Sequence, residues 1–188
     1  DFHGAVDRGE FELHFQPLVG AMSGALTGAE SLIRWKHPRL GLLAPVEFVP
    51  LAEGSGLVGR LGSFVLGRAM ADLGRWQQEL PRPEHPLFVT VNVSSRQIFR
   101  PESVQEIRHI LGRNIVPRGV LRLEVTETLV MENPEQAAEV LETLRGAGAD
   151  LALDDFGTGY SSLAYLQRFP FDTIKIYREI VRGSATPA

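Results

Sequence analysis

The residues with the clearest chemistry are two adjacent carboxylates, Asp154 and Asp155, which end a short apolar run and precede a Gly-Thr-Gly turn. A strand that ends in paired acids before a flexible loop is typical of a site at the carboxyl end of a parallel sheet. Oxygen-bearing side chains also lie near the ends of three other predicted strands. The candidate set is Glu30, Asn92, Glu124, Asp154 and Asp155. If the strands converge, these side chains gather at one rim.

Four carboxylates at one rim repel one another, because a like-charge pair about 4 Å apart costs on the order of 4 kcal/mol at an effective dielectric constant of about 20. Either several acids are protonated, or divalent cations lie between them. Carboxylate oxygens and one amide carbonyl select hard ions, so we expect Mg²⁺ or Mn²⁺, with Ca²⁺ able to compete and inhibit. Adjacent acids can serve two metals, which suits in-line attack on a phosphodiester.

Three other polar residues are candidates for the same rim. Lys175 lies on the sixth predicted strand, and beside metals in a desolvated mouth its pKa is expected to fall, so that the amine can take a proton from attacking water. Arg34 shares a strand face with Glu30 and can donate hydrogen bonds to a phosphate. Gln16 ends the first strand and can contribute a polar contact to the ligand.

Each candidate also has a purely structural interpretation. The alternatives are a helix cap at Asn92 to Ser95, solvated loop acids at Glu124 and Glu127, a turn at Asp154 to Gly157, and a solvent-facing Lys175. For Glu30 and Arg34 considered alone, a structural ion pair on one strand is the preferred interpretation. Five strands nevertheless place polar groups at the same relative position, and this favours a shared site.

The elements that would position these residues alternate along the chain. Strands are predicted over residues 11–15, 25–35, 87–93, 120–125, 151–155 and 173–176. Helices are expected over 45–52, 56–80 and 101–113, and from Asn133-Pro134 onward, with a short helical lead-in at 2–7. Residues 37–41 are expected to form a loop. The alternation predicts an α/β protein, either a (β/α) barrel or an open doubly wound sheet.

The division of strand side chains between the two faces of the sheet favours the barrel. On strands two to six, the large apolar side chains fall opposite the candidate site residues, which suits helices over one face and a crowded interior that ends in a polar mouth. Arg122 and Phe88 fit this division less well.

The composition excludes several classes of protein. The chain has 188 residues, 44% hydrophobic and 22% charged, which is ordinary for a globular domain. A net charge of −4 gives no basic surface for a nucleic acid polymer. There is no Cys, no apolar run of membrane-spanning length and no signal-peptide pattern. We therefore expect a cytoplasmic segment without membrane contact, whose parent protein can still be membrane-anchored.

Six motifs, in order from Phe11 to Val181, resemble the EAL domain family of cyclic di-GMP phosphodiesterases. They are Phe-Glu-Leu-His-Phe-Gln-Pro (11–17), Gly-Ala-Glu-Ser-Leu-Ile-Arg-Trp-Lys-His-Pro (28–38), Val-Asn-Val-Ser (91–94), Leu-Glu-Val-Thr-Glu (123–127), Asp-Asp-Phe-Gly-Thr-Gly-Tyr-Ser-Ser-Leu (154–163) and Asp-Thr-Ile-Lys-Ile (172–176). Six motifs in register are highly specific, whereas the name-giving tripeptide alone would be weak.

The resemblance implies a TIM-like barrel with an antiparallel first strand that hydrolyses cyclic di-GMP to linear pGpG with Mg²⁺ or Mn²⁺. By family analogy, the metal ligands are Glu30, Asn92, Glu124, Asp154 and Asp155, and the ligand contacts are Gln16, Leu32 and Arg34. Lys175 matches the lysine near the attacking water. Glu127 matches the acid that braces the loop at 157–162, which in the family couples metal binding to dimerisation. Diguanylate cyclase or sensor modules are the expected neighbouring domains.

The sequence departs from the family pattern in three places. Residues 30–32 read Glu-Ser-Leu where the family has Glu-Ala-Leu, a change that we expect to be tolerated. Tyr177 stands where Asp is usual, beside Lys175. The chain ends after the sixth strand, so the seventh-strand Glu and eighth-strand Gln of the family have no counterpart, and a truncated barrel with two open edges is expected.

Two hypotheses about function remain. The expected organisation is a lead-in at 1–10, an EAL domain at 11–181 and a disordered tail at 182–188. The first hypothesis is a metal-dependent phosphodiesterase that acts on cyclic di-GMP. The second is a catalytically impaired domain that acts as a cyclic di-GMP receptor or a protein-interaction module. A purely structural protein is the weakest alternative, because it leaves the convergent acids unexplained.

Overall fold

The computed structural model describes residues 4–80, 86–113, 117–157, 167–177 and 179–181. Its strands are β1 (Phe11–Val19), β2 (Leu26–His37), β3 (Gly41–Leu43), β4 (Phe88–Asn92), β5 (Leu121–Thr126), β6 (Asp150–Phe156) and β7 (Thr173–Ile176). Its helices are α1 (Pro45–Gly54), α2 (Val58–Glu79), α3 (Ser95–Ile98), α4 (Pro101–Arg113), α5 (Glu127–Glu132) and α6 (Pro134–Gly146). The expected tail at 182–188 and most of the loop at 157–162 lie outside the described residues.

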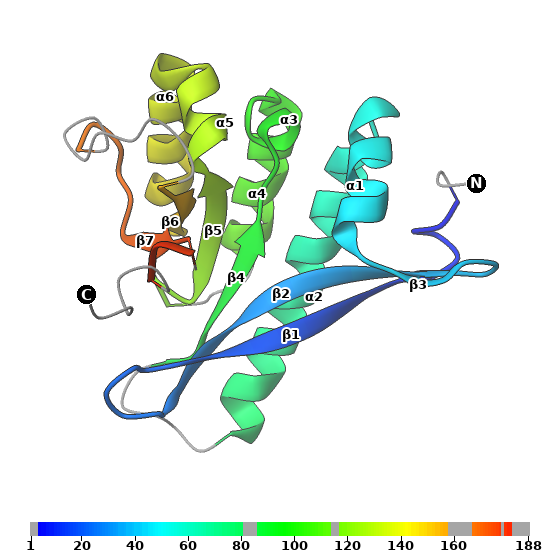
Figure 1. Ribbon diagram of the computed structural model, residues 1–188, viewed down its shortest axis with the longest axis horizontal. Coiled ribbons are helices and arrows are strands. Elements are labelled where there is room, and N and C mark those ends of the chain that lie inside the picture. Colours follow the sequence, from blue (N-terminus) through cyan, green and yellow to red (C-terminus); the bar gives the residue numbers. More distant parts are fainter. Residues whose placement is uncertain (1–3, 81–85, 114–116, 158–166, 178, 182–188) are drawn as a thin grey trace.

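A single mixed sheet organises the fold. The strand order is β1-β2-β4-β5-β6-β7, with β3 beside β2. β1 runs antiparallel to β2, whereas the pairs that lead from β2 through β4, β5 and β6 to β7 are parallel. Among the described residues the sheet does not close, and β1 and β7 are its edge strands (Figure 1). The predicted α/β fold with an antiparallel first strand is confirmed, and the open sheet is consistent with a truncated barrel.

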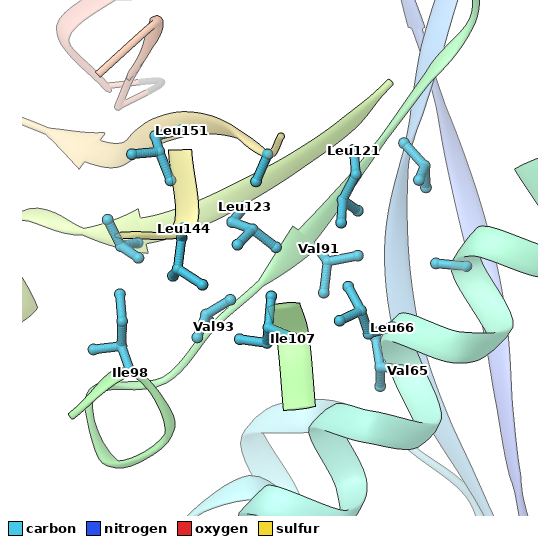
Figure 2. Packing of buried hydrophobic residues seen from close by; sticks show 14 of the residues in the cluster. Val65, Leu66, Val91, Val93, Ile98, Ile107, Leu121, Leu123, Leu144 and Leu151 are labelled. Atoms are coloured by element: carbon cyan, nitrogen blue, oxygen red, sulfur yellow. The ribbon is translucent and has the colours of Figure 1, made fainter. Parts of the chain in front are cut away.

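The core lies between one face of the sheet and helices α2, α4 and α6. Strand residues Val91, Leu123 and Leu151 are buried on this face. Figure 2 shows them beside helical side chains that include Leu66 and Ile107. Burial of apolar area is the main driving force for this packing. Because successive strand residues point to opposite faces, the polar residues between these positions are turned away from the core.

Several elements differ from the sequence expectations. The first strand continues through Gln16 and Pro17, because an edge strand tolerates a residue without a backbone N–H. The expected loop at 37–41 is a hairpin in which Gly41 has a φ of 78° and β3 pairs with β2. The described part of the helical lead-in expected at 2–7, residues 4–7, forms turns. The short helices α3 and α5, which directly follow β4 and β5, were not anticipated.

Arg122 and Phe88, the two residues that fitted the barrel pattern poorly, lie together. The Arg122 guanidinium carbon lies 4.1 Å from the centre of the Phe88 ring. An Arg122 nitrogen also lies 3.8 Å from a carboxylate oxygen of Asp150. A cation over an aromatic face with a carboxylate beside it is a favourable local arrangement. The exception to the apolar pattern is therefore a polar cluster near the start of the parallel strands.

No helix in the described part of the chain combines the length and the apolar character that crossing a membrane requires.

Gly28 allows β2 and β4 to approach closely. A Cβ added there would lie 2.5 Å from the Phe88 carbonyl oxygen and 2.8 Å from Phe88 ring carbons. We predict that Gly28→Ala lowers the free energy of unfolding by about 1–3 kcal/mol, because the strands must move apart. Urea unfolding followed by tryptophan fluorescence measures the change.

Gly67→Ala is the matched control, because a Cβ at that exposed position on α2 meets no atom within 4 Å. It is expected to raise the free energy of unfolding by up to about 1 kcal/mol. Equal stability of the two variants would contradict the proposed crowding between β2 and β4.

Candidate functional site

An ammonium group surrounded by three carboxylates forms the centre of the site. Lys175 Nζ donates hydrogen bonds to Glu124 Oε2 at 2.8 Å, to Glu30 Oε2 at 3.2 Å and to Asp154 Oδ2 at 3.3 Å. Asn92 Nδ2 donates to the other oxygen of Glu30 at 3.2 Å. These five residues come from β2, β4, β5, β6 and β7, so the strands converge as the sequence predicts.

Parallel pairing explains why the groups meet. Asn92 lies opposite Glu124 in the β4–β5 register, and Thr126 lies opposite Asp154 in the β5–β6 register. Residues in register near the carboxyl ends of parallel strands share one edge of the sheet. The sequence pattern of polar strand ends therefore becomes a cluster in space.

Asp172 fixes the strand that carries Lys175. Its backbone N–H donates to the Leu151 carbonyl at 2.9 Å, and its Oδ2 accepts from the Leu151 N–H at 3.0 Å. Its Oδ1 accepts from Arg145 at 3.1 Å. These bonds hold the start of β7 against β6 and so set how far Lys175 reaches along the mouth.

Burial dominates the electrostatics of Glu124. Its side chain is 1% exposed, and this burial raises the pKa of the carboxyl group. The hydrogen bond and charge of Lys175 oppose the rise, while the charges of Glu30 and Asp154 add to it. Glu124 therefore depends on a nearby cation to remain ionised.

The pKa of Lys175 is raised in the protein without metal, and the fall expected beside bound metals stays a prediction. Burial alone would lower the pKa of the amine, but the hydrogen bond to Glu124 and the charges of Glu124, Asp154 and Glu30 outweigh burial and raise it. Lys175 is therefore a firmly held ammonium ion in this state.

Asp155 follows Asp154 at an irregular point of the sheet. The β6–β7 register shifts between Leu153 and Phe156, and Asp155 has a φ of 55°. Its N–H donates to Asp154 Oδ1 at 2.9 Å. Burial and the charge of Asp154 raise the pKa of the Asp155 carboxyl group. Sheet irregularities of this kind are common beside active sites, where they redirect a side chain.

The donor set fits a hard divalent cation, although Lys175 now binds three of the acids. In the residues that the structure describes, no group of three His, Asp or Glu side chains is arranged to hold a metal as it stands. Glu124 Oε1, however, is buried without a hydrogen-bond partner. A buried carboxylate oxygen with no donor is costly. Carboxylate and amide oxygens at this position match the ligands of Mg²⁺ or Mn²⁺.

Several structural alternatives are wrong. Glu30 bonds to Asn92 and Lys175 instead of Arg34, whose guanidinium donates to the Ile33 carbonyl at 2.9 Å. Glu124 is not a solvated loop acid, because its side chain is buried. Lys175 points into the cluster and not to solvent. The helix-cap alternative is correct for Ser94, which occupies the N-cap position of α3.

Glu127 is also buried, at 3% exposure, and begins α5 directly after β5. The Thr126 hydroxyl accepts from the Leu129 N–H at 3.4 Å and caps this helix. Glu127 Oε2 accepts from the Gly157 N–H at 3.3 Å. The acid therefore ties the end of β5 to the residue that follows β6, where the predicted loop starts.

The three predicted ligand contacts lie near the acids without bonding to them. Gln16 is the cross-strand partner of Glu30. Leu32 and Arg34 follow Glu30 along the same face of β2. Of the three, Leu32 lines a cleft of about 610 Å³, which is within the usual size of a ligand pocket. Its lining includes Ser31, Leu32, Val46, Val49, Pro50, Asn92, Glu124 and Asp155.

The sequence reasoning missed two contributors to this cleft. One is α1, whose apolar residues Val46, Val49 and Pro50 line it. An apolar helix that is not fully buried was the available signal. The other is Ser31, a polar residue at a buried position of β2. The sequence pattern predicts that Ser31 lies on the core face, but it does not predict that Thr90 is its hydrogen-bond partner.

Replacement of Lys175 by Met leaves Glu124 buried beside two carboxylates with no ammonium group. We predict that Lys175→Met lowers the free energy of unfolding by on the order of 3 kcal/mol in metal-free buffer, because an unpaired buried charge remains. Urea unfolding in the presence of a chelator measures this loss.

Lys36→Met is the matched control, because Lys36 pairs with Glu12 at an exposed position. This variant is expected to lose less than about 1 kcal/mol of its free energy of unfolding. Similar losses in the two variants would show that the acid cluster does not depend on Lys175.

Comparison with known proteins agrees with this geometry. The family model described as "EAL domain" matches residues 1–187. The cyclic di-GMP phosphodiesterase NbdA of Pseudomonas aeruginosa is 42% identical over 173 residues, which is 92% of this chain and 22% of that protein. The bifunctional diguanylate cyclase/cyclic di-GMP phosphodiesterase MucR of the same organism is 38% identical over 185 residues, 98% of this chain and 27% of that protein.

A solved structure is also similar. The PaMucR phosphodiesterase in complex with c-di-GMP shares 37% identity and a TM-score of 0.89, covering 100% of this chain and 74% of that chain. The chain spans about a quarter of the length of these two Pseudomonas relatives. The family-model match, the identities and the shared fold lead to one conclusion: this chain belongs to the EAL domain family.

Proposed function

We propose that this EAL domain hydrolyses cyclic di-GMP to linear pGpG with Mg²⁺ or Mn²⁺. The observation that carries the proposal is the convergence of Glu30, Asn92, Glu124, Asp154 and Lys175 from five strands. NbdA and MucR, which bear the names of cyclic di-GMP phosphodiesterases, support it at the level of the family.

The metal ligands in this proposal are Glu30, Asn92, Glu124, Asp154 and Asp155. When bound, the ions would neutralise charge on the phosphodiester and supply an activated water. Glu124 Oε1, which has no hydrogen-bond partner, would be available to coordinate an ion. The Asn92 amide N–H already donates a hydrogen bond to Glu30. This bond orients two of the proposed ligands together.

Lys175 would act on the attacking water. In the metal-free protein its three carboxylate partners keep the amine protonated. Loss of those hydrogen bonds would remove the interactions that raise its pKa and leave the effect of burial, which lowers it. The amine could then accept a proton from water. Lys175 is thus a candidate general base only when the carboxylates are engaged elsewhere.

Gln16, Leu32 and Arg34 would bind the substrate. A guanidinium group donates charge-assisted hydrogen bonds to phosphate oxygens. Leu32 presents apolar surface in the cleft, and Gln16 lies opposite Glu30, so its amide can reach the same ligand. Glu127 would hold the loop that follows Gly157 in place. We extend the proposal to a homodimer that works beside diguanylate cyclase or sensor domains. The bifunctional name of MucR supports the diguanylate cyclase partner.

The test is turnover. Purified protein with Mg²⁺ or Mn²⁺ is expected to convert cyclic di-GMP to pGpG, and liquid chromatography measures the product. Ca²⁺ is expected to inhibit this turnover. Glu30→Ala and Asp154→Ala should each reduce turnover by about 100-fold or more, because each removes a proposed metal ligand.

Both variants should keep the far-ultraviolet circular dichroism of the parent, since removal of one acid relieves repulsion. Glu12→Ala is the control, because this acid lies on β1 and pairs with Lys36 outside the cluster. Unfolding of both site variants would instead mean that these acids are structural.

A second candidate is a receptor that binds cyclic di-GMP without hydrolysis. It is favoured by Lys175, which in this structure binds three of the acids that a metal would need. Calorimetric binding at micromolar nucleotide without any pGpG would support this candidate over the enzyme.

Arg34→Ala tests where the nucleotide binds in either case. We expect its affinity to fall by about 10- to 100-fold, since hydrogen bonds to a charged group are lost. Arg39→Ala, on the exposed β2–β3 hairpin, is the matched control and should bind normally. Unchanged binding by Arg34→Ala would place the ligand elsewhere.

A further inference from the structure

Ser31 is a polar residue on the core face of β2. It is 3% exposed, and the residues on the same face of the strand, Ala29 and Ile33, are buried hydrophobics. A buried hydroxyl needs a hydrogen-bond partner to offset its lost hydration. Ser31 Oγ donates to the backbone carbonyl of Thr90 on β4, 59 residues away, at 2.6 Å. The hydroxyl therefore links two strands.

The link lies where β2 and β4 separate. Their parallel pairing runs from Gly28 opposite Phe88 and ends at Ser31 opposite Val91. β2 then continues to His37 between β1 and β3, while β4 ends at Asn92. The cleft of about 610 Å³ opens at this point, and Ser31 is part of its lining. The hydrogen bond thus lies beside the cleft, at the end of the β2–β4 pairing.

A second hydrogen bond joins the same two strands on the opposite face. Asn92 Nδ2 donates to Glu30 Oε1 at 3.2 Å. Glu30 immediately precedes Ser31, and Asn92 follows Thr90 by two residues. The Ser31 bond therefore connects the backbones that carry these two site residues. Any increase in the separation of β2 and β4 at Ser31 would also separate Glu30 from Asn92.

We propose that Ser31 is a positioning residue that clasps β2 to β4 and thereby fixes Glu30 against Asn92 for metal binding. The inference rests on the proposed metal-dependent function of the same site. The Ser31 hydroxyl bonds to the Thr90 carbonyl and not to the acids or to the proposed ligand contacts, so it acts through the strand geometry. An alanine, which the family signature has at this position, would leave the strands joined only by their backbone pairing and the exposed Asn92 bond.

The experiment compares the full chain with Ser31→Ala, Ser31→Thr and Ser63→Ala. Ser63 is the matched control, because its hydroxyl donates to the Gly59 carbonyl at 3.0 Å within α2. Mn²⁺ binding is measured by calorimetry without nucleotide, and amide hydrogen exchange is measured over β2 and β4. Turnover is measured as a function of Mn²⁺ concentration.

Ser31→Ala is expected to weaken Mn²⁺ binding by about fivefold, which corresponds to the loss of one neutral hydrogen bond. Exchange should become faster at the end of the β2–β4 pairing. The Mn²⁺ concentration for half-maximal turnover should rise, while kcat at saturating Mn²⁺ stays within about twofold of the parent. Ser31→Thr should restore Mn²⁺ binding because it keeps the hydroxyl, and Ser63→Ala should leave it unchanged.

Two results would overturn the inference. One is parental Mn²⁺ affinity in Ser31→Ala despite a lowered unfolding midpoint, which would make the bond merely structural. The other is failure of Ser31→Thr to restore Mn²⁺ binding. Absence of turnover in the parent would refute the proposed enzyme, but the calorimetry and exchange would still decide the part played by Ser31.

Discussion

The hydrogen bonds from Lys175 to three carboxylates are the interaction on which the rest of the site depends. Glu124 is buried, and a buried carboxylate is stable as an ion only with a compensating cation. Lys175 supplies that cation from the last described strand, and Asp172 holds the strand in place through Leu151. The sheet and the site are thus coupled: the strands that bring the charges together are also held together by them.

This coupling leaves an imbalance of charge. One ammonium group faces Glu30, Glu124 and Asp154, and Asp155 follows directly along the chain. An excess of negative charge in a partly dry mouth creates a strong potential for divalent cations. Lys175 in the protein without metal and the ions in the proposed metal-bound state therefore compete for the same oxygens.

The sequence was sufficient for what depends on local periodicity. The alternation of apolar and polar residues on β4, β5 and β6 separates the core from the mouth, and parallel pairing then brings the strand ends together. The sequence did not predict the distances between side chains. The raised pKa of Lys175 in the metal-free protein reflects three particular carboxylates at 2.8–3.3 Å, a geometry that the sequence pattern does not specify. The Ser31–Thr90 bond spans 59 residues, and β3 arises only because a hairpin at Gly41 folds back on β2.

The backbone of Asp155 places a second demand on a residue proposed for its charge. With a φ of 55°, it lies in the left-handed region, where most residues are strained and Asn, Asp and Gly are the tolerated types. Asn would meet the backbone requirement without the negative charge, whereas Glu would keep the charge at a conformational cost. The position is thus restricted twice over, and its tolerance to mutation should follow backbone preference as closely as chemistry.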